Sequence, residues 1–439
     1  MVSSPPMRMP RQRLLRSNWM VPGCIRDCNS HAAGNPEEVE LKGALSGIGV
    51  LDLSGGGPAS IAARILGDMG ADVIAINSPP GAKSKGVGAG VPFMKGVDAP
   101  VHLDSLRNTK NVGINLKSPE GQRLFQELAL TTDVVIESFR PGVMDRLGLG
   151  YDVLSQRNPR LIFCSVTGYG KEGPQRDLPG HDANYAAMGG VLGLIGYSPD
   201  DPPVLVQNFL ADVTAAVLWG TIGILLAVRA RELTGRGQRV DVSMTDGVTF
   251  LLSSIPEVGE YFLRGIVPQR GSTFLGGSHP SYAVYETADK KWLTIAALEP
   301  HFWRNLCQSL RREDLTAKQY APSPTKEEVF DELRSIFKTK TRDEWFEQLS
   351  AADVPVGKVL NIDEVLSDPH LADRGMMVEV EHPRWGRMRQ IGLPIRLSDT
   401  PWEVRIPPAR LGDQTGEVMT DLGYSKDDIE RLRHKGVIC

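Results

Sequence analysis

Hydrophobic and polar positions alternate along the chain in a pattern that predicts strands separated by helices. Gly49–Leu53 is a short apolar run, Gly55–Gly57 interrupt it, and Pro58 stands at a favoured first helical position. The helix that follows has an apolar face formed by Ile61, Ala62, Ile65, Leu66 and Met69. Ala71–Ile76 then has the composition of a buried strand. This order predicts a βαβ unit with parallel strands.

The same order continues through the next hundred residues. A helical pattern over Pro119–Leu130 precedes the apolar run Val134–Glu137, and Tyr151–Gln156 precedes Leu161–Val166. Strands that alternate with helices indicate a parallel, doubly wound sheet in an α/β protein. Gly55–Gly57 lack the spacing of a dinucleotide fingerprint, so we interpret them as a tight turn.

Farther along, the pattern changes. Val213–Glu232 predicts a long apolar helix that ends at Gly235. The next expected elements are a strand at Val240–Met244, a helix at Val248–Leu263, an antiparallel pair at Ser281–Glu286 and Trp292–Ala296 around Asp289 and Lys290, a Pro-rich segment at Pro383–Pro408, and a final helix at Asp427–His434. The loss of the βαβ order predicts a second, smaller α+β domain.

Composition excludes several classes of protein. The 439 residues, 41% apolar and 23% charged, predict a globular protein of two or three domains. The 49 basic and 53 acidic residues form no basic stripe for nucleic acid, and no run approaches the ~18 apolar residues of a membrane helix. The five scattered cysteines indicate a reducing compartment, and Cys24 and Cys28 lack the partners of a zinc site. We expect neither a metal nor a nucleic-acid or membrane partner.

The N-terminal residues have the composition of a leader. The first 26 residues hold five arginines and no acidic residue. That fits a disordered leader, an organellar transit peptide, or an upstream start codon with Met20 as the true start. We therefore expect residues 1–44 to precede the folded protein, which is cytoplasmic, or mitochondrial if the leader is a transit peptide.

Four polar residues have an ordinary structural interpretation when taken alone. His181 and Asp182 suit a capped loop. Asp212, at the start of an apolar helix, suits an N-cap, because its carboxylate can accept from free helix N–H groups. Glu299 before Pro300 suits the start of a helix.

An ordered set of segments resembles the type III CoA-transferase and α-methylacyl-CoA racemase superfamily, from about residue 45 to 438. These segments are Gly57-Pro58, Gly67-Asp68-Met69-Gly70-Ala71-Asp72-Val73-Ile74, Glu137-Ser138-Phe139-Arg140-Pro141-Gly142, Gly180-His181-Asp182-Ala183-Asn184-Tyr185, Leu210-Ala211-Asp212, Thr234-Gly235-Arg236-Gly237-Gln238 and Leu422-Gly423-Tyr424-Ser425. The resemblance implies a Rossmann-like large domain built from both chain ends, a smaller α+β domain, and two subunits interlocked like chain links. It places the large CoA-binding domain at 45–240, linkers and the small domain at 241–380, and the return to the large domain at 381–439.

The resemblance also implies catalytic residues. Racemases of the superfamily resemble this chain at His181 and Glu299, and both branches share the aspartate matched by Asp212. By resemblance, Glu299 orients His181, Asn208 orients Asp212, and the backbone N–H of Asp182 is a candidate oxyanion donor. His181 and Asp212 can then serve the two faces of a planar enolate.

For coenzyme A, the resemblance implicates Lys110, Phe139, Arg140 and Arg146, since basic residues suit phosphate. Each cation can equally be a solvated surface charge. Gly276-Gly277 resembles a mobile loop over the acyl site, or is a simple turn. Two departures stand out, namely Val213-Thr214-Ala215-Ala216, where the racemases have glycines, and Ala75 and Ser78, where a basic residue commonly faces the nucleotide.

We therefore expect an acyl-CoA racemase or epimerase that acts at the α-carbon of 2-methylacyl-CoA thioesters by 1,1-proton transfer through an enolate. The substrate supplies coenzyme A, and no other cofactor is expected. The alternative is a type III CoA-transferase in which Asp212 forms an aspartyl anhydride. A third class is a CoA-binding protein without turnover, which the departures after Asp212 and at Ala75 leave open.

Overall fold

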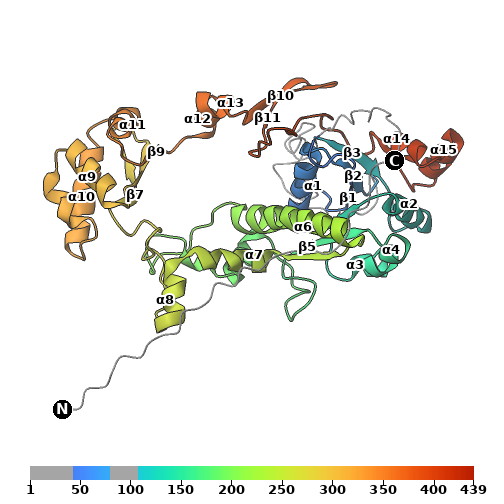
Figure 1. The fold of residues 1–439 in the computed structure, drawn as a ribbon, viewed down its shortest axis with the longest axis horizontal. Coiled ribbons are helices and arrows are strands. Elements are labelled where there is room, and N and C mark those ends of the chain that lie inside the picture. The colour runs from blue at the N-terminus through green and yellow to red at the C-terminus, as the bar shows by residue number, and fades with distance from the viewer. Residues whose placement is uncertain (1–42, 80–106) are drawn as a thin grey trace, which may run out of the picture. The chain divides into compact units, whose positions relative to one another are not determined.

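The computed structural model describes residues 43–79 and 107–439, and its largest element is a six-stranded parallel sheet (Figure 1). The strand order is β3-β2-β1-β4-β5-β6, which is the order of a doubly wound dinucleotide fold. The strands are β1 (Gly49–Asp52), β2 (Asp72–Asn77), β3 (Thr109–Gly113), β4 (Val134–Glu137), β5 (Ile162–Thr167) and β6 (Arg239–Ser243). The predicted parallel sheet is confirmed.

Helices cover both faces of this sheet, because its strands are apolar on both sides. In β4, for example, Val134 and Ile136 belong to one hydrophobic core and Val135 to the other. On the first face lie α1 (Pro58–Asp68), α5 (Asp182–Met188), η4 (Val191–Leu194), η5 (Phe209–Leu218), α6 (Trp219–Thr234) and α7 (Met244–Leu251). On the second lie α2 (Pro119–Leu130), α3 (Val143–Arg146), α4 (Tyr151–Arg157), α14 (Thr415–Asp421) and α15 (Lys426–His434).

The C-terminal residues complete the edge of the sheet at β3. The Gly113 N–H donates to Thr415 Oγ1 at 3.0 Å, and the Asn111 N–H donates to Gln414 Oε1 at 2.8 Å. Ile114 and Ile438 form an antiparallel bridge beyond β3. This cover explains why β3 is buried although its sequence, with three polar side chains, did not predict a strand.

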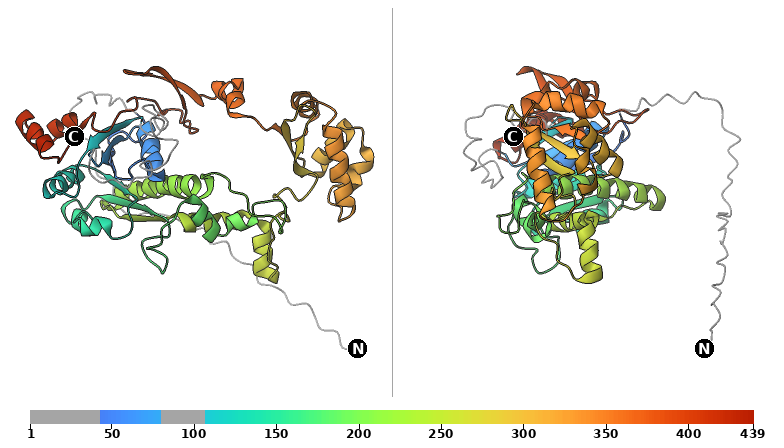
Figure 2. Two further views of the ribbon diagram at one scale, coloured as in Figure 1. Left: turned by 180° about the vertical axis from the view of Figure 1, so that it is seen from behind. Right: turned by 90° about the vertical axis from the view of Figure 1, so that its left-hand side faces the viewer.

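A second, smaller sheet has the predicted antiparallel pair and one further strand. It comprises β7 (Tyr282–Glu286), β8 (Trp292–Ala296) and β9 (Val356–Lys358), with Lys290 at a φ of 60° in the β7–β8 turn. The helices α9 (Pro300–Ser309), η7 (Glu313–Lys318), α10 (Thr325–Phe337) and α11 (Arg342–Ala351) pack against it (Figures 1 and 2). Their shared core is rich in aromatic side chains, among them Tyr285, Trp303, Phe337 and Trp345.

Two local expectations were wrong, and one hairpin was not predicted. The helix predicted from Val213 begins at Phe209, and its first ten residues are π-helical. The helix predicted over Val248–Leu263 breaks after Ser254, because Pro256 holds the preceding residue extended and starts a new helix. The Pro-rich segment contains half of a hairpin. The break in the predicted helix gives η6 (Leu252–Ser254) and α8 (Pro256–Arg264). The hairpin consists of β10 (Met377–His382) and β11 (Gly386–Ile391), and it follows two short helices, α12 (Ile362–Leu366) and α13 (Pro369–Asp373).

One helix overturns the expectation that no segment has the length and apolar character of a membrane span. The continuous helix Phe209–Thr234 has 26 residues and satisfies both criteria. Its inner face nevertheless packs on α1 and β5, with Ala211, Ala215 and Ile224 in the core. A core helix of a soluble protein meets the same criteria, so this helix is weak evidence for a membrane.

Candidate functional site

His181 stands at the N-cap of α5, where its backbone is held in place. Its φ and ψ are −133° and 179°, and its N–H donates to Asn184 Oδ1 at 3.0 Å. The side chain is exposed. The backbone is therefore fixed, while the imidazole remains accessible to a substrate.

Asp212 is the fourth residue of η5 and is half-buried. Asn208 occupies the cap position, and its Nδ2 lies 3.5 Å from Asp212 Oδ2. The N-cap interpretation of Asp212 is therefore wrong. The capping acceptor is Asp182, whose Oδ2 accepts from the N–H groups of Ala211 at 2.8 Å and Asp212 at 2.9 Å.

The electrostatics of this cluster favour a protonatable carboxyl. Burial, followed by the nearby Asp182 charge, raises the pKa of Asp212 above its ordinary value. The hydrogen bond from Asn208 and the positive charge that His181 can take act in the opposite direction without cancelling the rise. His181 and Asp212 are therefore close enough to interact, and Asp212 can hold a proton at a higher pH than a free aspartate.

Tyr185 is a site residue to which sequence reasoning gave no role. Its hydroxyl donates to Gly180 O at 2.5 Å, and its ring packs edge-on against Tyr169. A side chain at Gly168 or Gly180 would collide with this ring. Burial raises the pKa of Tyr185 to about 12, with Asp212 adding to the rise and Arg140 opposing it. Tyr185 therefore holds the loop before His181 and lies near both Asp212 and Arg140.

The structure does not join Glu299 to His181. Glu299 is the N-cap of α9, as its place before Pro300 suggested, and its side chain is exposed. Its charge contributes to raising the pKa of Tyr320. Within residues 43–79 and 107–439, Glu299 makes no hydrogen bond or ion pair with His181. Its predicted orienting role stays a prediction.

The Asp182 backbone N–H remains available as an oxyanion donor. It lies in the first turn of α5, where N–H groups have no intrahelical partner. No acceptor for it is found in the part of the chain that the structure describes. This N–H follows His181 directly, so a donor for a developing negative charge lies next to the imidazole.

The four residues predicted to hold coenzyme A differ in their availability. Lys110 Nζ already pairs with Glu417 at 2.7 Å and Asp421 at 3.7 Å, and the bond to Glu417 is the main cause of its raised pKa. Phe139 packs against the core, whereas Arg140 and Arg146 are exposed. The two arginines are therefore the more accessible cations, whereas the positive charge of Lys110 is already paired with the carboxylates of Glu417 and Asp421.

The residues that depart from the racemase pattern differ in how far they are buried. Ala215 and Ala216 are fully buried in the core, where they cannot line an acyl pocket, while Val213 and Thr214 remain partly exposed. In β2, Ala75 faces the core and Ser78 is exposed beyond the strand end. Gly276 and Gly277 lie in a tight turn. The residues Cys24, Cys28 and most of the leader fall outside the described residues.

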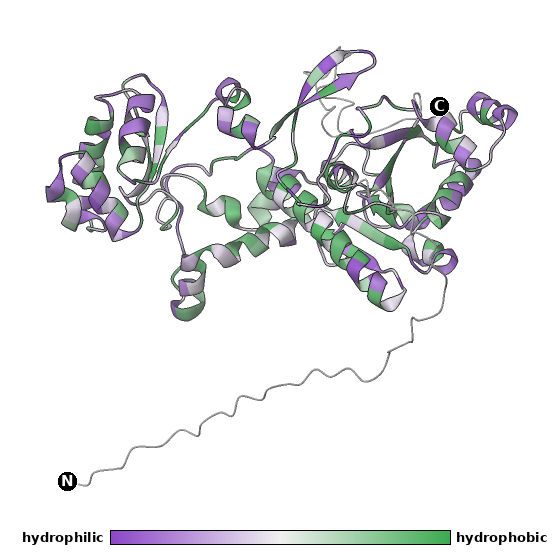
Figure 3. Cartoon of the chain, turned by 45° about the horizontal axis from the view of Figure 1, so that its top comes forward, coloured by the Kyte–Doolittle hydropathy of each residue, from purple (hydrophilic) through white to green (hydrophobic). Residues whose placement is uncertain are grey.

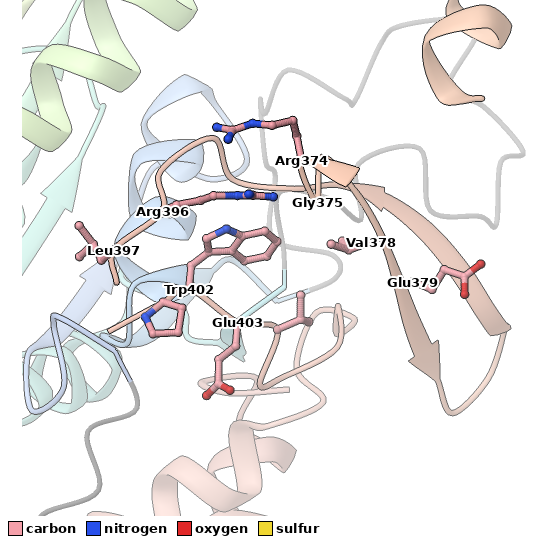
Figure 4. A pocket seen from close by; sticks show the side chains of 10 residues that line it. Arg374, Gly375, Val378, Glu379, Arg396, Leu397, Trp402 and Glu403 are labelled. Atoms are coloured by element: carbon pink, nitrogen blue, oxygen red, sulfur yellow. The ribbon is translucent and has the colours of Figure 1, made fainter. Parts of the chain in front are cut away.

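Two cavities lie apart from His181 and Asp212. One, of about 320 Å³, is lined by Gly142, Ser165, Lys171 and other residues near the ends of β5 and β6. The other, of about 580 Å³, is formed by the segment 374–404, with Arg374 and Arg396 near Trp402 (Figure 4). No cluster of three potential metal ligands occurs in the described residues. Neither cavity contains a predicted catalytic residue, so the candidate site is identified from the cluster around His181 and Asp212 and not from a cavity.

Taken together, a parallel sheet in dinucleotide-fold order and an acid–base cluster after β5 define an α/β protein with a candidate proton-transfer site. The chain belongs to CoA-transferase family III, whose family model matches residues 45–415. It is 34% identical over 403 residues to the succinyl-CoA–L-malate CoA-transferase beta subunit of Chloroflexus aurantiacus, which covers 90% of this chain and 98% of the relative. It is 31% identical over 395 residues to human α-methylacyl-CoA racemase, which covers 90% and 97%.

Solved structures give the same result. A CAIB/BAIF family protein from Brucella suis superposes with a TM-score of 0.74 at 26% identity, over 87% of this chain and 99% of that one. The structural and sequence relatives agree on an enzyme of this family. Because the relatives include both racemases and CoA-transferases, membership alone does not select the activity.

Proposed function

We propose that this protein is an acyl-CoA racemase or epimerase acting at the α-carbon of 2-methylacyl-CoA thioesters. The observation that supports it is the pairing of an exposed His181 with a half-buried Asp212 whose pKa is raised. A two-base proton transfer needs groups that can each both donate and accept a proton near neutrality. Histidine does so without help, and the surroundings of Asp212 bring its carboxyl closer to that range.

In the proposed reaction, one of the two residues removes the α-proton while the C–H electron pair moves into the thioester carbonyl. The resulting enolate is planar, and the N–H of Asp182 stabilises its oxygen. The other residue, initially protonated, returns a proton to the opposite face, and the thioester carbonyl forms again. The reverse reaction exchanges the two roles. No electrons are gained or lost, so the cycle needs no redox cofactor.

We also infer that the active unit is the interlocked homodimer. Exposed apolar side chains support it, since Phe262 and Leu263 on α8 are 80% and 86% exposed. Figure 3 shows hydrophobic segments along α8 and the long helix that ends in α6. Such patches mark interaction surfaces. In the dimer, Glu299 of the partner subunit would supply the orienting carboxylate that this chain alone does not bring to His181.

The predicted division into domains follows the same proposal. The large CoA-binding domain would comprise 45–240 and 381–439, with 241–380 as linkers and small domain. The bonds of Gln414 and Thr415 to β3 support the return of the chain end. Arg140 and Arg146 would contact the phosphates of CoA, with Phe139 beside them and Lys110 released from its acidic partners.

The second candidate is a CoA-transferase, which the transferase relatives at 33–34% identity favour. In that reaction the Asp212 carboxylate attacks the thioester carbonyl, the CoA thiolate leaves, and a mixed anhydride forms. The nucleophile must be ionised, whereas burial and Asp182 favour the protonated Asp212. The racemase uses both the protonated and the ionised form of Asp212, whereas this attack uses the ionised form alone, so a raised pKa of Asp212 is compatible with the racemase.

The experiment is stereochemical. A single epimer of a 2-methylacyl-CoA is incubated with the protein, with no free acid present, and the two epimers are separated by chiral chromatography. We expect an equilibrium mixture of both. Unchanged configuration, together with transfer of CoA to a carboxylic acid added in a parallel reaction, would replace the racemase by the transferase.

A further inference from the structure

The Asp182 side chain forms contacts that are separate from the oxyanion role of the Asp182 backbone N–H. It is 7% exposed, and a single oxygen, Oδ2, accepts from two consecutive N–H groups. Both donors belong to the first turn of η5, where the N–H groups have no preceding helical carbonyl to bond. Asp182 therefore caps the helix that contains Asp212 from a separate element, α5.

The carboxylate is stabilised mainly by backbone groups. Within the described residues, the hydrogen bonds of the Asp182 side chain come from backbone N–H groups, and no lysine, arginine or histidine forms an ion pair with it. A buried carboxylate in this position depends on the two N–H bonds and on the positive end of the helix. Its charge is consequently not cancelled by a cation, and it acts on its neighbour Asp212.

We propose that the Asp182 carboxylate is a positioning residue for the proton transfer, since it fixes the backbone of Asp212 and keeps an uncancelled negative charge beside that side chain. This inference rests on the proposed function for its catalytic part only. The other groups that face Asp212 are His181 and Asn208, with Tyr185 and Arg140 nearby. Asp182 differs from them because it bonds the Asp212 main chain.

Two substitutions separate the two effects. Asp182→Asn retains an oxygen that can accept from both N–H groups but removes the charge. Asp182→Ala removes the acceptor as well. Asp152→Asn is the matched control, because it removes an exposed carboxylate that pairs with Arg239 on the surface. All three are compared with the unaltered full chain.

The first readout is amide hydrogen exchange at Ala211 and Asp212, which does not depend on activity. We expect protection to persist in Asp182→Asn and Asp152→Asn and to be lost in Asp182→Ala. Unchanged protection in Asp182→Ala would overturn the proposed capping. Should Asp182→Ala not fold, the pH profile of Asp182→Asn provides the test, and an unmoved Asp212 limb would overturn the proposal.

The second readout is the pH profile of α-proton exchange. Removing the charge of Asp182 favours ionised Asp212, so the limb that reports Asp212 should move to lower pH in Asp182→Asn. In Asp182→Ala, kcat should fall about 100-fold with KM changed much less, since misplacing a reacting group costs on that order. An unmoved limb, or wild-type kcat in Asp182→Ala, would refute the catalytic part. If wild type racemises nothing while the exchange result holds, only the proposed function fails.

Discussion

The ion pair of Asp68 and Arg107 offers a stability prediction whose magnitude follows from its geometry. Both side chains are completely buried. Arg107 bonds Asp68 through Nη2 at 2.7 Å and Nε at 3.0 Å, and its Nη1 donates to Ile391 O at 2.7 Å. The pair thus fastens the C-terminal segment to the end of α1. Removing one member leaves the other as an uncompensated buried charge, which costs about 3–5 kcal/mol.

The test is a double-mutant cycle measured by urea unfolding, with the midpoint and slope followed by tryptophan fluorescence. Asp68→Asn and Arg107→Met should each lower the free energy of unfolding by about 3–5 kcal/mol. The double variant should lose less than the sum, by about 2 kcal/mol, because no charge is stranded. Glu260→Gln, which breaks the exposed pair with Arg264, should cost under about 1 kcal/mol. A cost for Asp68→Asn as small as that of the control would rule out a stabilising role for the buried pair.

The remaining predictions concern the site and the dimer. His181→Ala should slow α-proton exchange by about 10²- to 10⁴-fold with an unchanged melting temperature. The control His434→Ala, which alters an exposed histidine on α15, should change neither the exchange rate nor the melting temperature. Full activity in His181→Ala would make His181 a structural residue. Asp212→Asn should be more stable than wild type at pH 7 but not at pH 3 in chemical denaturation. The raised pKa of Asp212 means that folding disfavours its ionised form, so the stability that the protonated carboxyl contributes is lost as pH rises through the folded pKa. The same difference in stability between Asp212→Asn and wild type at both pH values would contradict this. Leu263→Asp should shift the mass measured by light scattering toward the monomer, and a wild-type dimer mass would place the interface elsewhere.

The parallel sheet was predictable because local signals and burial agree. Val134–Glu137 is apolar on both faces, which is the pattern of a strand between two helical layers, and α2 begins and ends where Pro119 and Leu130 predicted. By contrast, β3 contains three polar side chains and is buried only because Gln414 and Thr415, about 300 residues later, cover it. Long-range cover of this kind leaves no periodic signal in the strand itself.

The site was predictable in its members but only in part in its geometry. The family segments located His181, Asp182 and Asp212, whereas the helix containing Asp212 begins four residues earlier than expected. Its cap comes from Asp182, 30 residues away along the chain, so the local rule that an acidic residue at a helix start caps it assigned the wrong residue. The pairing of Lys110 with Glu417 likewise joins distant segments and was beyond reach of the sequence.

Solvent deuterium is the most direct probe of whether His181 and Asp212 move the α-proton of an acyl-CoA. The protein is incubated in D₂O with a 2-methylacyl-CoA and no acceptor acid, the α-carbon is examined by mass spectrometry and NMR, and hydroxylamine is added to a parallel sample. Proton transfer by this pair should place deuterium at the α-carbon and leave no acyl adduct on Asp212. An unexchanged α-proton across a panel of 2-methylacyl thioesters, with an adduct trapped on Asp212, would contradict it.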